Sequence, residues 1–155
     1  MKYYAVIDTN VLVSALLSKS DTAATVEIYK KIMTGDLVPL YSQAILREYD
    51  EVLHRPRFGF ADNLVSDLLY AIFNRGILID VSTEGIILND MGDVPFYAVV
   101  MAERDKDAYL VTGNIKHFPK ETFIVTPREM LDIMTGCNLS PITHLVCDSG
   151  KKYNR

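Results

Sequence analysis

Near its N-terminus the chain carries the segment YYAVIDTN (residues 3–10), in which an uncharged run is followed at once by an acid, a hydroxyl and an amide. A short apolar run of this kind predicts a β-strand over residues 3–7. Asp8 stands directly after that strand. In open α/β sheets ligands bind beyond the carboxyl ends of the strands, so Asp8 is the first candidate site residue.

Strands and helices are expected to alternate along the rest of the chain. Short apolar runs predict further strands over residues 37–41, 77–81, 108–112 and 122–125. Amphipathic stretches predict helices over residues 9–17, 21–33, 42–54, 62–75, 94–104 and 127–136. The expected N-caps are Asp21, Ser42, Asp62 and Thr126, the last within a capping box. Helical connections between strands predict an α/β fold, a three-layer α/β/α sandwich with a central parallel sheet.

The composition fits one globular domain. The chain has 155 residues, of which 49% are hydrophobic and 23% charged, and this balance excludes overall disorder. The net charge of −4 excludes a basic protein that wraps nucleic acid, but not a nuclease whose contacts are local or metal-mediated. We expect one folded domain over residues 1–136 and a C-terminal tail, partly ordered at best, over residues 137–155.

The sequence favours a cytoplasmic protein without a membrane anchor. No segment reaches the roughly 18 apolar residues that a membrane span needs. Asp8 interrupts the first apolar run, which is unlike a signal peptide. Cys137 and Cys147 both lie in the tail, where one disulfide would constrain little, so we expect a reducing compartment.

Two further polar residues stand where they can face the same crevice as Asp8. Asn114 follows the strand predicted over residues 108–112, and Asp93 precedes the helix predicted from residue 94. Alternatively, Asp8 and Asp93 are N-caps, and Asn114 accommodates a left-handed turn. A cap uses one carboxylate oxygen, so capping does not exclude metal binding.

Glu48 is a candidate because of its place on a helical wheel. The helix over residues 42–54 has an apolar face made of Ile45, Leu46, Tyr49, Val52 and Leu53. Among the acids of this helix, Glu48 lies closest to that face. The alternative is an ordinary boundary glutamate whose aliphatic stem covers apolar surface.

Three carboxylates in one crevice would require a cation. If Asp8, Glu48 and Asp93 converge, their mutual repulsion raises their pKa values unless a cation neutralises them. Mg²⁺ or Mn²⁺ fits best because hard cations prefer oxygen ligands. Such a cation can activate water and stabilise the charge that develops during attack on a phosphodiester. Zinc is disfavoured because the histidines and cysteines show no zinc-ligand spacing.

Four segments occur in an order and spacing that together are specific. They are VIDTNVLVSA (6–15), REYDEVL (47–53), DVPFY (93–97) and YLVTGN (109–114). Through them, residues 3–134 resemble the PIN-domain family of metal-dependent ribonucleases. Within that family the chain resembles the bacterial group described as toxin components of toxin–antitoxin systems.

The resemblance implies a parallel-sheet sandwich whose acidic pocket binds Mg²⁺ or Mn²⁺ and cuts RNA. Asp8 matches the first acid of the family, Glu48 the acid on a helix and Asp93 the third. Asn10 matches the polar residue that braces the first acid, and Thr9 offers a hydroxyl nearby. We expect Asp8 and Asp93 to bind the metal directly and Glu48 to orient water or a second metal.

The fourth acidic position of the family, often aspartate, is Asn114 here. An amide keeps one oxygen ligand and removes one negative charge, so the site charge falls from about −4 to about −3 and a second metal binds less readily. Asp90, in the loop before Asp93, is positioned to compensate. We therefore expect one tightly held metal.

Contacts to substrate are less specific in the sequence. Lys116 and His117 can reach a phosphate, and Arg55 and Arg57 can contact an RNA backbone. Solvated loop residues are the commoner alternative in both cases. Four tyrosines fall mainly on apolar faces, which predicts a place in the core and not a base-stacking role: Tyr41, Tyr49, Tyr70 and Tyr97.

Two functions from different classes remain. The first is a metal-dependent endoribonuclease, the toxin of a toxin–antitoxin pair, for which the resemblance implies RNA, an antitoxin protein and a second copy as partners. The second is a catalytically weak PIN-like module that binds RNA or protein, which Asn114 and the pI of about 5.3 favour. An aspartyl-phosphate phosphotransferase needs a second aspartate two residues after the first, and position 10 is asparagine.

Overall fold

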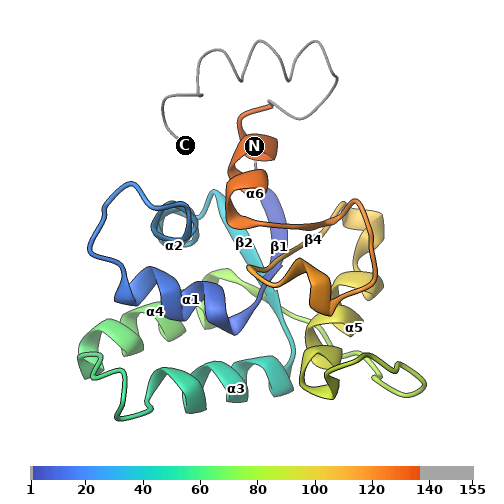
Figure 1. The fold of residues 1–155 in the computed structure, drawn as a ribbon, viewed down its shortest axis with the longest axis horizontal. Coiled ribbons are helices and arrows are strands. Elements are labelled where there is room, and N and C mark those ends of the chain that lie inside the picture. The colour runs from blue at the N-terminus through green and yellow to red at the C-terminus, as the bar shows by residue number, and fades with distance from the viewer. Residues whose placement is uncertain (1, 137–155) are drawn as a thin grey trace.

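The structure, a computed structural model, describes residues 2–136 (Figure 1). Five parallel strands form one sheet in the order β3-β2-β1-β4-β5. The strands are β1 (Tyr3–Ile7), β2 (Leu37–Tyr41), β3 (Ile77–Leu78), β4 (Tyr109–Val111) and β5 (Ile124–Val125). The predicted α/β fold with a central parallel sheet is confirmed.

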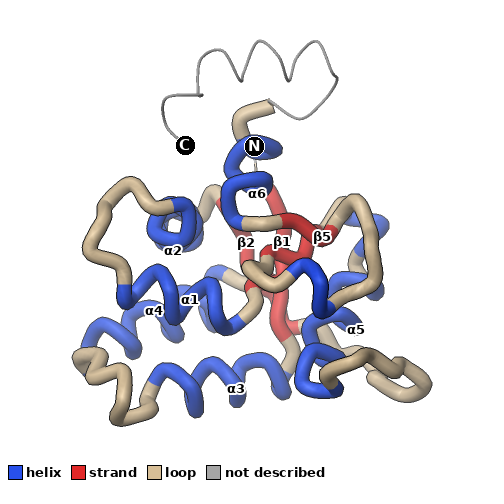
Figure 2. Tube along the Cα trace, in the orientation of Figure 1, coloured by secondary structure: helices blue, strands red, loops and turns tan. Residues whose placement is uncertain are grey.

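Helices lie on both sides of the sheet (Figures 1 and 2). They are α1 (Thr9–Leu17), α2 (Ala24–Thr34), α3 (Gln43–Leu53), α4 (Asp62–Arg75), α5 (Val94–Ala102) and α6 (Pro127–Met134). In Figure 1, α1, α2 and α4 lie on one side of the strands and α5 lies on the other. None of these helices is long and apolar enough to cross a membrane.

The strand order brings the ends of β1 and β4 together. β1 lies between β2 and β4, and Ile7 pairs with Val111. The N–H of Asp8 donates to the carbonyl of Val111 at 2.9 Å, so Asp8 and Thr112 leave the sheet side by side. From β1 the sheet extends to β2 and β3 on one side and to β4 and β5 on the other. The segments that follow β1 and β4 therefore lead to opposite sides, and a crevice forms between them.

Two of the predicted helix starts are confirmed. The hydroxyl of Ser42 accepts a hydrogen bond from the Ile45 N–H at 3.3 Å and caps α3. Thr126 and Glu129 form the reciprocal bonds of a capping box at the start of α6. Both signals are local, and residues within one turn suffice to satisfy them.

The predicted caps at Asp21 and Asp62 are wrong. Hydrogen bonds between Ser20 and Thr22 hold the chain in a turn, so α2 begins only at Ala24. Asp62 is the first residue of α4 and not its cap, and there its charge interacts favourably with the positive end of the helix dipole.

Strand β3 is shorter than the predicted range of residues 77–81. It is an edge strand, and its pairs with β2 are Leu40 with Ile77 and Tyr41 with Leu78. β2 ends at Tyr41, and Ser42 then caps α3. The Ile79 N–H still donates to the Tyr41 carbonyl at 2.7 Å, but within the described part of the chain residues 80 and 81 add no further pair to the sheet.

Most of the buried polar residues lie at one edge of the sheet. Within residues 2–136 the buried polar or charged residues are Asp8, Thr9, Thr112 and Asp132. Three of them lie at the carboxyl ends of β1 and β4. Because burying polar groups costs free energy, their grouping at one edge marks that edge for a function other than packing.

Candidate functional site

Asp8 stands at the N-cap position of α1, and its side chain is held by the residue that follows the neighbouring strand. Its side chain is buried and makes no capping hydrogen bond to α1. Instead, its Oδ2 accepts a hydrogen bond from the hydroxyl of Thr112 at 2.7 Å. Burial raises the pKa of Asp8, although the Thr112 bond acts in the opposite direction. Asp8 therefore occupies the N-cap position that the alternative predicts, while its carboxylate is bound by Thr112.

Thr112 is a functional residue that the sequence did not single out. It is fully buried, and its hydroxyl donates to Asp8 and accepts from the backbone N–H of Asn114 at 2.9 Å. The available signal was its position, since it follows β4 as Asp8 follows β1. Only the pairing of Ile7 with Val111 shows that the two are adjacent.

Glu48 faces Asp8 from the helix above the crevice. The predicted apolar face of α3 is confirmed, with Ile45, Tyr49 and Leu53 buried and Glu48 half-buried at its boundary. The Tyr49 hydroxyl donates to the carbonyl of Ile7, which fixes α3 against the end of β1. The hydroxyl of Thr9 donates to Glu48 and holds the carboxylate toward the crevice.

Asp93 carries the least satisfied carboxylate of the site. It ends a short 3₁₀ turn, η1 (Met91–Asp93), at the start of α5, and it makes no capping bond. Its Oδ2 is buried and has no hydrogen-bond partner in the described part of the chain. Burial, together with the charges of Asp8 and Asp90, raises the pKa of Asp93 from 3.8 to about 6.

These carboxylates line one cavity of about 280 Å³. Its lining residues are Asp8, Thr9, Asn10, Glu48, Glu51, Val52, Arg55, Arg57, Phe58, Asp90, Gly92 and Asp93. The structure thus brings together Asp8, Glu48 and Asp93, which the sequence proposed from three separate segments. Asp90, expected to compensate for Asn114, also reaches the cavity.

Other candidate residues lie outside the cavity or at its rim. Asn114 and Lys116 do not line it, and Asn114 acts on Asp8 through its backbone bond to Thr112. Arg55 lines it but pairs with Glu51 at 2.8 Å. Whether Asn114 is a ligand and whether Lys116 or Arg55 contacts substrate stay predictions.

The most compact set of potential ligands differs from the predicted one. Within residues 2–136 it consists of Asp90, Asp93 and His117, whose ligand atoms lie within 4.8 Å of one another. Asp8 and Glu48 are not part of it, and their carboxylates accept hydrogen bonds from Thr112 and Thr9. His117 ends another 3₁₀ turn, η3 (Ile115–His117), which follows β4.

The donors of the cavity suit a divalent cation. Carboxylate oxygens dominate, as Mg²⁺ and Mn²⁺ prefer. The buried Oδ2 of Asp93, which accepts no hydrogen bond from residues 2–136, is the structural observation that fits such an ion, because a buried acceptor without a hydrogen bond costs free energy that a ligand would recover. Asp8, Glu48, Asp90 and Asp93 are the residues that would hold it.

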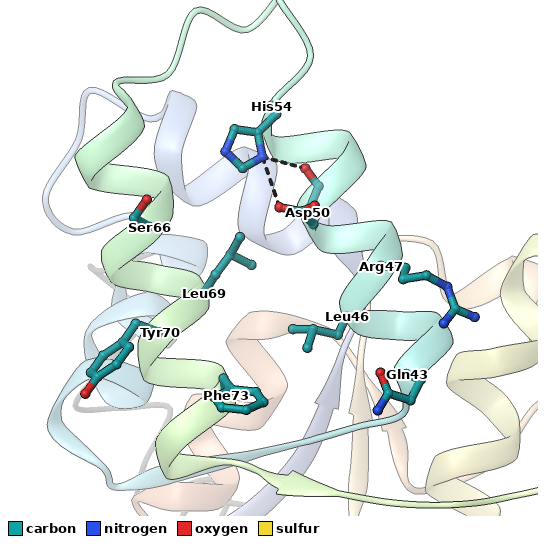
Figure 3. A pocket seen from close by; sticks show the side chains of 9 residues that line it. All are labelled: Gln43, Leu46, Arg47, Asp50, His54, Ser66, Leu69, Tyr70 and Phe73. Atoms are coloured by element: carbon teal, nitrogen blue, oxygen red, sulfur yellow. Dashed lines mark hydrogen bonds and ion pairs between the residues drawn. The ribbon is translucent and has the colours of Figure 1, made fainter.

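A second, apolar cavity lies between α3 and α4 (Figure 3). Its lining residues include Leu46, Leu69, Tyr70 and Phe73, and at one end His54 bonds to Asp50. The prediction that Tyr70 lies in the core is wrong, since its side chain is 71% exposed. The buried face of α4 is formed by Val65, Leu68, Ala71 and Ile72, and Tyr70 points away from it.

Tyr41 and Tyr49 are buried and Tyr97 is half-buried against the core, as predicted. The predicted tail and both cysteines lie outside the described residues.

Comparison with known proteins identifies one family. A family model described as PIN domain matches residues 4–116, well over half of the chain. The matched range contains every carboxylate of the cavity and ends one residue before His117. No curated protein matches the chain.

Proposed function

Because this chain belongs to the PIN domain family, whose members are generally metal-dependent nucleases, we propose that it is a metal-dependent endoribonuclease. The observation that carries the proposal is the convergence of Asp8, Glu48, Asp90 and Asp93 on one cavity, with a buried oxygen of Asp93 that accepts no hydrogen bond from residues 2–136. Carboxylates that are brought together from separate elements repel one another, and the binding of a cation offsets this electrostatic free energy.

The residues take distinct roles in this proposal. Asp8 and Asp93 hold the cation, and Thr112 orients Asp8 through its hydroxyl. Glu48, fixed by Thr9, faces the cavity and orients the attacking water. When bound, the cation lowers the pKa of water and offsets the charge that develops on the phosphodiester.

The choice of RNA as substrate rests on the resemblance and on the rim of the cavity. Arg55 and Arg57 lie at the rim beside Phe58, and the guanidinium of Arg57 stacks over the Phe58 ring at 4.9 Å. In this position the arginine side chains can contact the phosphates of an RNA backbone that approaches the cation.

The test is cleavage of a mixed single-stranded RNA by the purified chain with Mn²⁺, with Mg²⁺ or with EDTA. Asp8→Asn and Glu48→Gln should each lower metal-dependent cleavage by about a hundredfold or more. Asp50→Asn is the matched control, because Asp50 also lies on α3 but lines the other cavity. It should cleave like the wild type.

Two outcomes would contradict the proposal. Cleavage that survives both substitutions would place the site elsewhere. A folded chain that binds RNA but cuts with neither metal would favour the alternative, a catalytically weak RNA-binding module.

We further propose the toxin role in the cytoplasm, with an antitoxin protein and a second copy of the chain as partners. A basic side chain of an inhibitor protein could block an open cavity that is rich in carboxylates, which supports a toxin that an antitoxin controls. Induced expression should arrest bacterial growth, and Asp8→Asn should not. Light scattering of the purified chain tests the dimer.

A further inference from the structure

Three potential cation ligands meet beside the carboxylate cavity from two separate loops. Asp90 and Asp93 flank η1, and His117 ends η3 after β4. Their ligand atoms lie within 4.8 Å of one another, the one such group in residues 2–136. Unlike the cavity itself, this group combines oxygen donors with an imidazole nitrogen.

The spacing at the centre of this group fits a shared ion better than a hydrogen bond. His117 Nδ1 lies 3.6 Å from Asp93 Oδ2, which is too far for a hydrogen bond. That oxygen is buried and accepts no hydrogen bond from the described residues. Ligand atoms about 2.1 Å from one octahedral ion lie about 3.0 Å apart when adjacent and about 4.2 Å apart when opposite. The observed separation falls between these limits.

The other two ligands are held in place by their own loops. One oxygen of Asp90 accepts a hydrogen bond from the Gly92 N–H at 2.9 Å, which fixes the carboxylate and leaves its second oxygen for a ligand. His117 is followed by Phe118, whose buried ring anchors η3 to the core. Small rotations of the exposed Asp90 and His117 side chains therefore suffice to close the group around an ion.

We propose that Asp90, Asp93 and His117 form a second cation position, which shares Asp93 with the cavity and selects a divalent transition metal over Mg²⁺. This inference rests on the proposed function in one respect, namely that a cation binds at Asp93. Imidazole is a good ligand for first-row transition metals, whereas Mg²⁺ keeps oxygen and water ligands. The oxygen donors of the cavity accept either ion, so the discrimination depends on His117.

The test measures metal binding without RNA. Mn²⁺ is the probe, because it accepts both oxygen and imidazole ligands and because electron paramagnetic resonance counts the free ion. The full-length, metal-stripped chain should bind two Mn²⁺. His117→Ala should weaken one of them by about tenfold or more and lower the preference for Mn²⁺ over Mg²⁺ by a similar factor. Pulsed measurements should show ¹⁴N coupling to Mn²⁺ in the wild type and none in His117→Ala.

His54→Ala is the matched control. His54 is also half-exposed and also faces an aspartate, with its Nδ1 3.2 Å from Asp50, but no third potential ligand joins this pair within residues 2–136, and His54 does not line the carboxylate cavity. It should retain both Mn²⁺ ions and the nitrogen coupling. Circular dichroism of each variant confirms the fold.

The inference is overturned if the wild type binds at most one Mn²⁺, or if His117→Ala matches the wild type in stoichiometry, metal preference and nitrogen coupling. Its failure is distinguishable from failure of the proposed function. If RNA cleavage depends on Asp8 but His117→Ala binds Mn²⁺ like the wild type, the nuclease proposal stands and only the second cation position is contradicted. If His117→Ala loses the nitrogen-coordinated Mn²⁺ but the wild type cuts no RNA, the second cation position stands and only the proposed nuclease activity is contradicted.

Discussion

Replacing Asp93 by asparagine should stabilise the metal-free protein at pH 7.5 while it removes cation binding. The carboxyl of Asp93 has its pKa raised from 3.8 to about 6 by burial and by neighbouring carboxylates. At about 1.4 kcal/mol per pH unit, that difference sets an upper limit of about 3 kcal/mol on what the ionised carboxylate costs the folded state, and solvent screening at this partly exposed residue lowers the cost. Asparagine carries no charge but inherits the buried position, so we expect a net gain of about 1–2 kcal/mol.

The sign of the pH dependence follows from the raised pKa. Between about pH 4 and pH 6 the folded chain holds the Asp93 proton and the unfolded chain releases it, so this group makes the wild type less stable as the pH rises. Above pH 6 the full cost applies. Near pH 4 the carboxyl is largely protonated in the folded chain and the cost is small, so most of the advantage of the asparagine variant should disappear.

The assay is urea unfolding in EDTA, followed by circular dichroism at pH 7.5 and at pH 4. Glu51→Gln is the matched control, because Glu51 lines the same cavity but is exposed and paired with Arg55. Its effect should stay within about 0.5 kcal/mol. The reasoning is refuted if Asp93→Asn is no more stable than the wild type at pH 7.5, or if its gain is equally large at pH 4.

Three other substitutions test the supports of the site. Thr112→Val keeps the shape of the side chain but leaves Asp8 without its hydrogen bond, so urea unfolding should show a loss of about 1–3 kcal/mol and calorimetry a weaker Mn²⁺ affinity. Tyr49→Phe removes the bond to the Ile7 carbonyl and should cost about 1–2 kcal/mol in urea unfolding. Ser42→Ala should lower the thermal midpoint through the loss of about 1 kcal/mol of capping free energy, and an unchanged midpoint would contradict the assigned cap.

Much of the fold could be predicted because its signals are local. The apolar run of residues 3–7, the Ser42 cap and the capping box at Thr126 each depend on neighbours within a few residues. The wrong predictions concern features that depend on residues far away in the sequence. β3 ends where β2 stops offering hydrogen bonds, and the orientation of Tyr70 depends on which face of α4 meets the core.

The candidate site divides in the same way. Asp8, Glu48 and Asp93 were found because a strand end, a helix face and a helix start each mark one residue. Thr112 was missed because its bond to Asp8 spans two strands whose pairing no local pattern reveals. The approach of His117 to Asp93 likewise joins two loops that only the folded chain brings together.

The proposed activity requires that the carboxylate cavity at the ends of β1 and β4 binds a divalent cation. Anomalous diffraction at the manganese edge, from crystals of the full chain soaked in Mn²⁺, tests it most directly. We expect a peak about 2.2 Å from carboxylate oxygens of Asp8 and Asp93. Density for Mn²⁺ only on other parts of the surface, with the cavity holding water alone, would contradict it.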